Sequence, residues 1–189
     1  MIILSSYGFY HITIRNQLKE LFSDKSGKML IIPLASSYGM KYGIREKESA
    51  VDAGFSRENI FVFNEENPDM FLEMKFDYIV VIGGNTFRLL QKVKMYGLDT
   101  FIKEQVKNGA DYIGISAGAC IACPDIEYVR NFDDNNFITD GNFSGLALTD
   151  KYILCHFDER GTAEIKMCRQ FIGYDTELIT INDNQIVIL

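Results

Sequence analysis

The segment Gly114-Ile115-Ser116-Ala117-Gly118 matches the Gly-x-Ser-x-Gly pattern of a nucleophile elbow. In an elbow, a tight turn between a strand and a helix lifts the serine hydroxyl above the edge of a sheet, and only small neighbours fit beside it. Residues 112–115 are apolar enough for a buried strand, and residues 117–122 can begin a helix whose N-terminus favours negative charge. Ser116 is therefore the candidate nucleophile of a serine hydrolase.

A serine hydroxyl needs an adjacent base, and histidine is the usual one because it changes charge near neutral pH. The chain has two histidines. His11 lies near the start of the first expected helix, a position typical of a surface or helix-end residue. His156 follows an apolar run at residues 152–155, so it lies at the end of a strand, as Ser116 does. We expect His156 to be the base.

The third member of a triad is an acid that fixes the tautomer of the histidine. Asp133, Asp134, Glu127 and Asp158 compete for this role. Asp133 or Asp134 would give the chain order Ser, Asp, His that elbow hydrolases share. Asp158 lies two residues beyond His156, the spacing of the His-x-Glu pair in glutamine amidotransferases. The residues alone leave the acid open.

Two glycines could stabilise the oxyanion that forms when a serine attacks a carbonyl. Gly83-Gly84-Asn85 closes the apolar run at residues 78–82 and opens a helix, with Asn85 as its expected N-cap. Bare backbone N–H groups at such a junction can point at a reacting carbonyl oxygen. We expect the oxyanion hole to consist of the N–H groups of Gly84 and Ala117.

The elements that position these residues follow an α/β pattern, in which short β-branched runs alternate with helical stripes. Continuous apolar runs suit strands that are buried on both faces of a parallel sheet. The expected parallel strands are residues 2–5, 30–34, 60–63, 78–82 and 112–115. Further along, residues 152–155 predict a strand, residues 162–172 a helix, and residues 178–181 with 186–189 a hairpin that turns at Asn182-Asp183-Asn184.

Composition narrows the class of protein. The 189 residues suffice for one domain with a sizeable core, so we expect a single hydrolytic domain over residues 1–189. A net charge of −7 provides no basic stripe, which argues against nucleic acid or an anionic membrane as partner. The first 20 residues lack the features of a secretory signal, and the apolar runs are too short to span a membrane. A cytoplasmic location is expected.

The four cysteines, Cys120, Cys123, Cys155 and Cys168, are too few and too clustered for a disulfide scaffold. The pair Cys120-x-x-Cys123 could suggest zinc, but no second Cys or His pair has zinc-ligand spacing. We expect buried, reduced thiols and no metal.

Taken together, three runs resemble the dipeptidase E (aspartyl dipeptidase) and cyanophycinase group of serine peptidases. They are residues 81–90 (VIGGNTFRLL), residues 109–119 (GADYIGISAGA) with 122–124 (ACP) after them, and residues 155–157 (CHF). The resemblance implies a fold like that of class I glutamine amidotransferases, with a three-layer, mainly parallel sheet, helices on both faces, a Ser-His-acid triad and no cofactor.

Carried over by residue, the resemblance puts the nucleophile at Ser116, the base at His156 and an oxyanion donor at Gly84. The acid falls on Asp133 or Asp134 once a short gap is allowed after Pro124, and Asp133 is preferred over Asp134 and Asp158.

The resemblance further implies hydrolysis of dipeptides or other small peptide amides, with Asp-X dipeptides as one class. An acidic substrate needs a cationic partner, ideally an arginine fork. Arg160, four residues after His156, is the first candidate, ahead of Arg88 and Arg130.

Two alternatives remain from the residues alone: an α/β-hydrolase esterase, and a catalytically silent protein that uses the elbow pocket to hold a small ligand. Apart from a small peptide substrate, a homodimer is left open as a partner.

Overall fold

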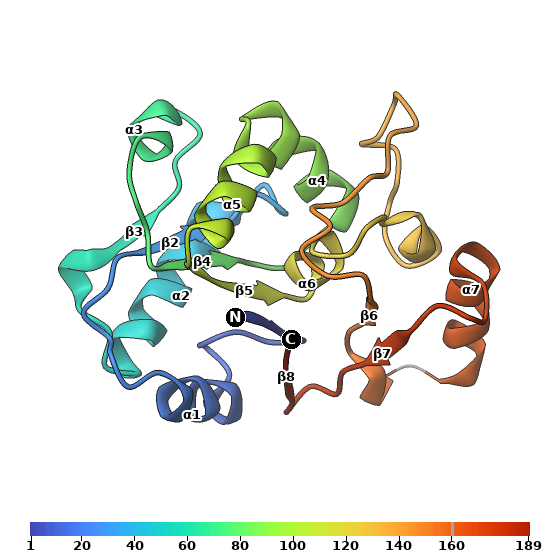
Figure 1. Cartoon of the computed structure of the whole chain (residues 1–189), viewed down its shortest axis with the longest axis horizontal. Coiled ribbons are helices and arrows are strands. Elements are labelled where there is room, and N and C mark those ends of the chain that lie inside the picture. Colours follow the sequence, from blue (N-terminus) through green and yellow to red (C-terminus); the bar gives the residue numbers. More distant parts are fainter. Residues whose placement is uncertain (160) are drawn as a thin grey trace.

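The computed structural model describes residues 1–159 and 161–189. Its main sheet has six strands in the order β3-β2-β4-β5-β1-β8. The strands are β1 (Ile2–Ser5), β2 (Met29–Ile32), β3 (Ile60–Val62), β4 (Tyr78–Val81), β5 (Asp111–Ile115) and β8 (Ile186–Ile188). The first five run parallel, as predicted, and β8 pairs antiparallel with β1. This last pairing brings the two termini side by side at the centre of Figure 1.

The strands are buried on both faces, which explains their continuous apolar runs. Every residue of β1, β2 and β4 is buried. Because successive side chains of a strand point to opposite faces, Leu4 and Leu30 belong to one core while Ile3 and Ile31 belong to the other. The sheet therefore needs helices on both sides.

Helices cover both faces of the sheet (Figure 1). On one face lie α1 (Ile12–Leu21) and α2 (Gly39–Asp52). The other face is covered by α4 (Thr86–Met95), α5 (Leu98–Lys107) and α6 (Ala117–Ile121). The remaining helices are α3 (Asp69–Leu72) and α7 (Thr162–Ile172), with single helical turns at Arg57–Asn59, Glu127–Val129 and Phe157–Glu159. The predicted three-layer α/β architecture is confirmed.

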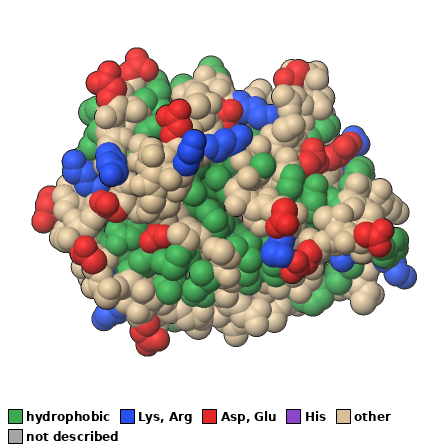
Figure 2. Space-filling view, viewed as in Figure 1, with side chains coloured by type: hydrophobic (Ala, Val, Ile, Leu, Met, Phe, Trp, Pro, Cys, Tyr) green, Lys and Arg blue, Asp and Glu red, His purple; other side chains and the backbone are tan. Residues whose placement is uncertain are grey.

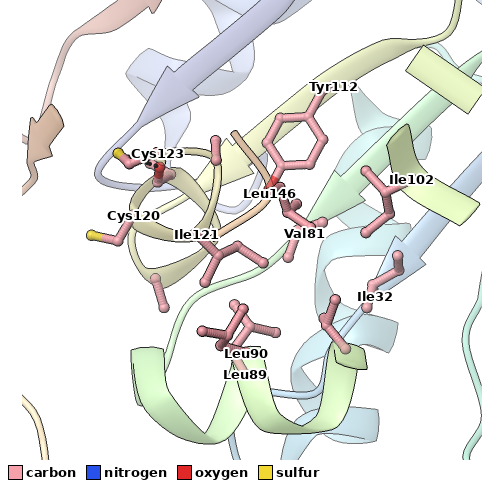
Figure 3. Packing of buried hydrophobic residues seen from close by; sticks show 14 of the residues in the cluster. Ile32, Val81, Leu89, Leu90, Ile102, Tyr112, Cys120, Ile121, Cys123 and Leu146 are labelled. Carbon is pink, nitrogen blue, oxygen red and sulfur yellow. Dashed lines mark hydrogen bonds between the residues drawn. The ribbon is translucent and has the colours of Figure 1, made fainter. Parts of the chain in front are cut away.

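Helix α4 illustrates how local sequence sets this packing. Its predicted N-cap is confirmed, because the side chain of Asn85 accepts a hydrogen bond of 2.8 Å from the backbone N–H of Arg88. Figure 3 shows Leu89 and Leu90 of this helix pointing into the core that Val81 and Ile121 share. The cap therefore fixes where the helix begins, and the apolar stripe fixes which face it buries.

The predicted hairpin near the C-terminus is wrong. Strand β7 (Leu178–Thr180) pairs in parallel with β6 (Tyr152–Leu154) in a separate two-stranded sheet, while β8 joins the main sheet. The physical reason is that β1 would otherwise present an unpaired edge, and β8 satisfies it: Ile2 and Leu189 exchange backbone hydrogen bonds of 3.1 and 2.9 Å. The turn at residues 182–184 consequently crosses from one sheet to the other.

The remaining expectations concern thiols and surface. All four cysteines are buried thiols that form no disulfide with one another, as predicted. On the face shown in Figure 2, acidic and basic side chains are interspersed rather than gathered by sign. None of the helices in the described part of the chain combines the length and the apolar character that crossing a membrane requires.

Candidate active site

Ser116 occupies the predicted turn between β5 and α6, and its backbone is strained. Its φ of 52° and ψ of −111° lie outside the regions that residues other than glycine ordinarily adopt. The turn is tight because a Cβ on Gly118 would lie 2.0 Å from the carbonyl oxygen of Val81, and one on Gly114 would lie 2.7 Å from the carbonyl oxygen of Gly118. Both glycines of the Gly-x-Ser-x-Gly pattern are thus required by close backbone contacts.

His156 meets Ser116 as the sequence predicts. Its Nε2 atom lies 3.0 Å from Oγ of Ser116. His156 follows β6 and also has a positive φ, 58°, so both residues of the pair are held in unusual backbone conformations. Such strain is found where the surrounding structure imposes a functional geometry.

The acid beside His156 is Asp183. Nδ1 of His156 lies 2.8 Å from Oδ1 of Asp183, and both side chains are largely buried. A neutral imidazole that donates Nδ1–H to this carboxylate presents the lone pair of Nε2 to the hydroxyl of Ser116. Asp183, His156 and Ser116 therefore form a continuous chain of hydrogen bonds.

Asp133, the acid that the sequence analysis favoured, contacts Thr86, whereas the carboxylate on the ring of His156 is that of Asp183. Oδ2 of Asp133 accepts hydrogen bonds from the backbone N–H and the hydroxyl of Thr86, at 2.8 and 2.6 Å. The carboxylate thus binds the first turn of α4, where orphan N–H groups and the helix dipole favour a negative charge. Chain order alone could not distinguish this helix-capping role from a contact with His156.

The carboxylates of Asp134 and Asp158 accept hydrogen bonds from backbone N–H groups. Oδ1 of Asp134 accepts a hydrogen bond from the backbone N–H of Asn136 at 3.1 Å, within its own turn. Oδ2 of Asp158 accepts one from the backbone N–H of Asp183 at 2.8 Å. Asp158 thus holds the loop that carries the acid.

Asp183 was missed although one sequence signal pointed to it. It lies in the predicted turn directly after an apolar run, which is strand β7. The carboxyl ends of parallel neighbouring strands meet at the same edge of a sheet, and functional groups gather there. The structure pairs β6 and β7 in parallel. A prediction of this pairing from the sequence would have placed His156 and Asp183, which follow the two strands, close together.

Ser6 lies directly after β1 and forms hydrogen bonds with two segments of the site. Its hydroxyl donates to the carbonyl oxygen of Ile181 at 3.0 Å and accepts from the backbone N–H of His156 at 2.9 Å. In addition, the backbone N–H of Ser116 donates to the carbonyl oxygen of Ser5 at 2.8 Å. Ser5 at the end of β1 and Ser6 directly after it thereby position the serine, the histidine and the strand end that precedes Asp183.

The glycine pair at the end of β4 closes the site from the other side. A Cβ on Gly83 would lie 2.8 Å from Cβ of Ser116, so this backbone passes directly beside the serine. Gly84 has a φ of 142°, and a Cβ there would lie 2.6 Å from the carbonyl oxygen of Ala35. Among the described residues, none accepts a hydrogen bond from the backbone N–H of Gly84 or of Ala117. Both N–H groups are thus available to a ligand.

Two small cavities meet at the serine and the histidine. Gly84, Ser116 and His156 line both of them. The first has a volume of about 180 Å³ and extends to Arg45 and Glu46 on α2. The second has a volume of about 170 Å³ and extends over the start of α6.

The family follows from comparison with known proteins. The model of peptidase family S51 matches residues 1–189 of the chain. The chain belongs to peptidase family S51. The predicted membership of the peptidase E group, and with it the prediction of a hydrolase of the peptidase class, is confirmed.

Individual relatives of this S51 chain are similar over different lengths. The uncharacterized peptidase Lmo0363 of Listeria monocytogenes is 30% identical over 177 residues, which make up 90% of this chain and 86% of the relative. Peptidase E of Salmonella arizonae is 43% identical over 83 residues, 44% of this chain and 35% of that protein. The crystal structure of a candidate peptidase E protein from Listeria monocytogenes EGD-e matches with a TM-score of 0.78 and 27% identity, covering 100% of this chain and 93% of that one.

The sequence of this S51 chain predicts an arginine, Arg160, Arg88 or Arg130, as the partner of an acidic substrate. No contact among the described residues places one of those three arginines at the cavities beside Ser116. Arg160 lies outside the described residues. Arg130 pairs with Glu127, with 2.9 Å between Nη1 and Oε1, and the guanidinium of Arg88 lies 5.8 Å from the ring centre of Phe137. Neither Arg88 nor Arg130 lines a cavity at Ser116.

Proposed function

We propose that this S51 chain is a serine peptidase that hydrolyses dipeptides or similarly short peptides, with Ser116 as nucleophile, His156 as base and Asp183 as the acid of the triad. The observation that carries the proposal is the hydrogen-bond chain from Asp183 through His156 to Ser116, with distances of 2.8 and 3.0 Å.

The geometry supports a two-step acyl transfer. Nε2 of His156 takes the proton of the Ser116 hydroxyl while Oγ attacks the peptide carbonyl carbon. The imidazolium that results is stabilised by the carboxylate of Asp183 and gives its proton to the amine that leaves when the peptide C–N bond breaks. Water then attacks the acyl-enzyme with the same histidine as base, which releases the acid and restores the Ser116 hydroxyl.

The negative charge on the carbonyl oxygen needs donors that are in place before the reaction. The unpartnered N–H groups of Gly84 and Ala117 flank Ser116 and are proposed as those donors. Ala117 begins α6, so its N–H also lies at the positive end of the helix dipole, although α6 is short.

Cavity size supports a short substrate. A dry cavity of about 150 Å³ holds a ligand the size of benzene, so the cavities of about 180 and 170 Å³ suit one residue each. Two such cavities on either side of Ser116 fit the two halves of a dipeptide.

A preference for Asp-X dipeptides would rest on Arg45 in place of Arg160. Arg45 is the one lysine or arginine among the residues that line these two cavities in the described part of the chain. Its guanidinium lies 3.9 Å from the ring centre of Tyr10, a stacking contact that leaves its N–H groups free for a carboxylate.

The test combines labelling with a substrate screen. A fluorophosphonate probe should label the wild type and the Ser37→Ala control, whose serine is exposed, but not Ser116→Ala. The wild type and Ser116→Ala are then compared on a dipeptide library and on matched acyl esters. For each substrate that the wild type cleaves, kcat of Ser116→Ala should be lower by at least about 10³-fold. Retention of more than a tenth of the wild-type activity would overturn the assignment, and turnover of esters without peptides would favour an esterase.

A further inference from the structure

Glu46 is a buried carboxyl group that lines the cavity of about 180 Å³ at Ser116, and the proposed hydrolysis does not use it. It lies on α2 and lines the same cavity as Ser116 and His156, yet only 2% of its surface is exposed. Burial raises the pKa of Glu46 to about 7, although hydrogen bonds from the backbone N–H groups of Phe9 and Tyr10, together with the charge of Arg45, lower it. The fold therefore keeps a carboxyl group where its charged form is unfavourable.

One oxygen of Glu46 has no partner. No described residue donates a hydrogen bond to Oε2, which is fully buried. A Cβ on Gly8 would lie 2.6 Å from this oxygen, so the absence of a side chain at Gly8 leaves room for the carboxylate under the loop. A buried carboxylate oxygen without a donor costs free energy, and a ligand that brings a charged donor would recover it.

We propose that Glu46 binds the α-ammonium group of the substrate's N-terminal residue, which restricts this site to peptides with a free amino terminus. The inference rests on the proposed function of Ser116. The residue whose carbonyl is attacked would fill the cavity of about 180 Å³, with its carbonyl at Ser116 and its ammonium group at the carboxylate. A charge-assisted hydrogen bond then satisfies Oε2.

The neighbouring guanidinium of Arg45 favours an α-ammonium group over a basic side chain. Arg45 and Glu46 line the cavity together, so a guanidinium and a carboxyl group lie beside a bound residue. A first residue of lysine or arginine would bring two positive charges near Arg45, one on its α-ammonium group and one on its side chain. A neutral or acidic first residue brings only the positive charge of its α-ammonium group, which Glu46 can balance. The recognised class is therefore a peptide with a free amino terminus and a first residue that is not basic.

The experiment compares the dipeptide that the wild type cleaves fastest with its N-acetyl derivative. A hydrogen bond between charged groups contributes enough that kcat/KM should favour the free dipeptide by at least about tenfold. Glu46→Gln keeps an acceptor for Phe9 and Tyr10 but loses the charge, so it should raise KM for the free dipeptide by about tenfold and abolish the preference. The matched control is Glu48→Gln on the same helix, which removes an exposed ion pair with Arg57 and should keep the preference.

Each outcome decides between the parts of the proposal. If the wild type cleaves free and acetylated dipeptides at equal rates, Glu46 does not bind the α-ammonium group. Fluorophosphonate labelling of Ser116 would in that case still support the proposed hydrolase activity. A preference for basic first residues that survives acetylation would assign Glu46 to a side chain instead and would also overturn the inference. Loss of labelling in the wild type would instead reject the proposed function itself.

Discussion

Oδ1 of Asp183 lies 2.8 Å from Nδ1 of His156, and the two residues follow two paired parallel strands, β7 and β6. Two residues support this contact through three hydrogen bonds. Asp158 accepts a hydrogen bond from the backbone N–H of Asp183, and Ser6 links the backbone of His156 to that of Ile181. This network of backbone contacts fixes the acid relative to the base.

Asp183→Asn should lower kcat by about 10³ to 10⁴ while the protein stays folded. The amide keeps the shape of the carboxylate but favours the wrong tautomer of His156 and cannot stabilise the imidazolium. Steady-state hydrolysis of the best dipeptide, with circular dichroism as a check on folding, measures the effect.

The matched comparison is Asp133→Asn, which alters the cap of α4 and not the histidine contact. It should cost about 1 kcal/mol of stability and leave kcat within a few-fold of the wild type. A larger loss of kcat in Asp133→Asn than in Asp183→Asn would make Asp133 the acid of the triad.

Ser6→Ala should weaken both the fold and the site. Ser6 is buried, and removal of its hydroxyl leaves the backbone N–H of His156 without its acceptor. The carbonyl oxygen of Ile181 loses one of two hydrogen bonds and keeps the one from the backbone N–H of Phe157 at 3.1 Å. An unsatisfied buried N–H group costs about 1–3 kcal/mol, so the urea midpoint should fall. Fluorophosphonate labelling of Ser116 should also slow at temperatures where the variant is fully folded, and an unchanged labelling rate would show that the loop does not position the histidine.

Stability should fall as the pH rises through the titration of Glu46. Burial holds the pKa of this carboxyl at about 7 in the folded chain, against an ordinary value of 4.5, so the folded state keeps a proton that the unfolded state has lost. The free energy of unfolding should therefore decrease between about pH 4.5 and 7, by up to about 3 kcal/mol, and level off above that range.

Glu46→Gln isolates this contribution, because other groups titrate in the same range. The difference in unfolding free energy between the variant and the wild type should grow from pH 5 to pH 8, with the variant more stable at pH 8. Urea titrations at several pH values measure it. A variant that is less stable than the wild type at pH 8 would indicate that the charged carboxylate supports the fold.

The four thiols should not react while the protein is folded. All are buried, and burial raises the pKa of Cys123, so little thiolate is present at neutral pH. Intact-mass measurement after treatment with iodoacetamide at pH 8 should show no addition to the native protein and four additions in urea. Rapid alkylation of native protein at Cys120 or Cys123 would point to a redox role for the Cys-x-x-Cys pair.

Sequence by itself determined what depends on short-range geometry. The elbow at Ser116 is fixed within five residues, because glycines at positions 114 and 118 permit close backbone contacts on either side of the turn. The strand cores, the cap at Asn85 and the position of His156 at a strand end follow from local patterns in the same way. These features also supplied the runs by which the family could be recognised.

Tertiary structure alone decided which acid meets the histidine and what lies in the cavity beside the serine. Asp133 is nearer to His156 in the sequence than Asp183 is, yet it caps α4, whereas parallel pairing of two three-residue strands brings Asp183 to the ring. Glu46 lines the same cavity as Ser116 but comes from α2, far away in the sequence. The strand order of the sheet brings the two together, and no local sequence pattern encodes that order. Strands this short carry too little periodicity to specify their partners, so the choice of partner is made by burial and backbone hydrogen bonding across the whole chain.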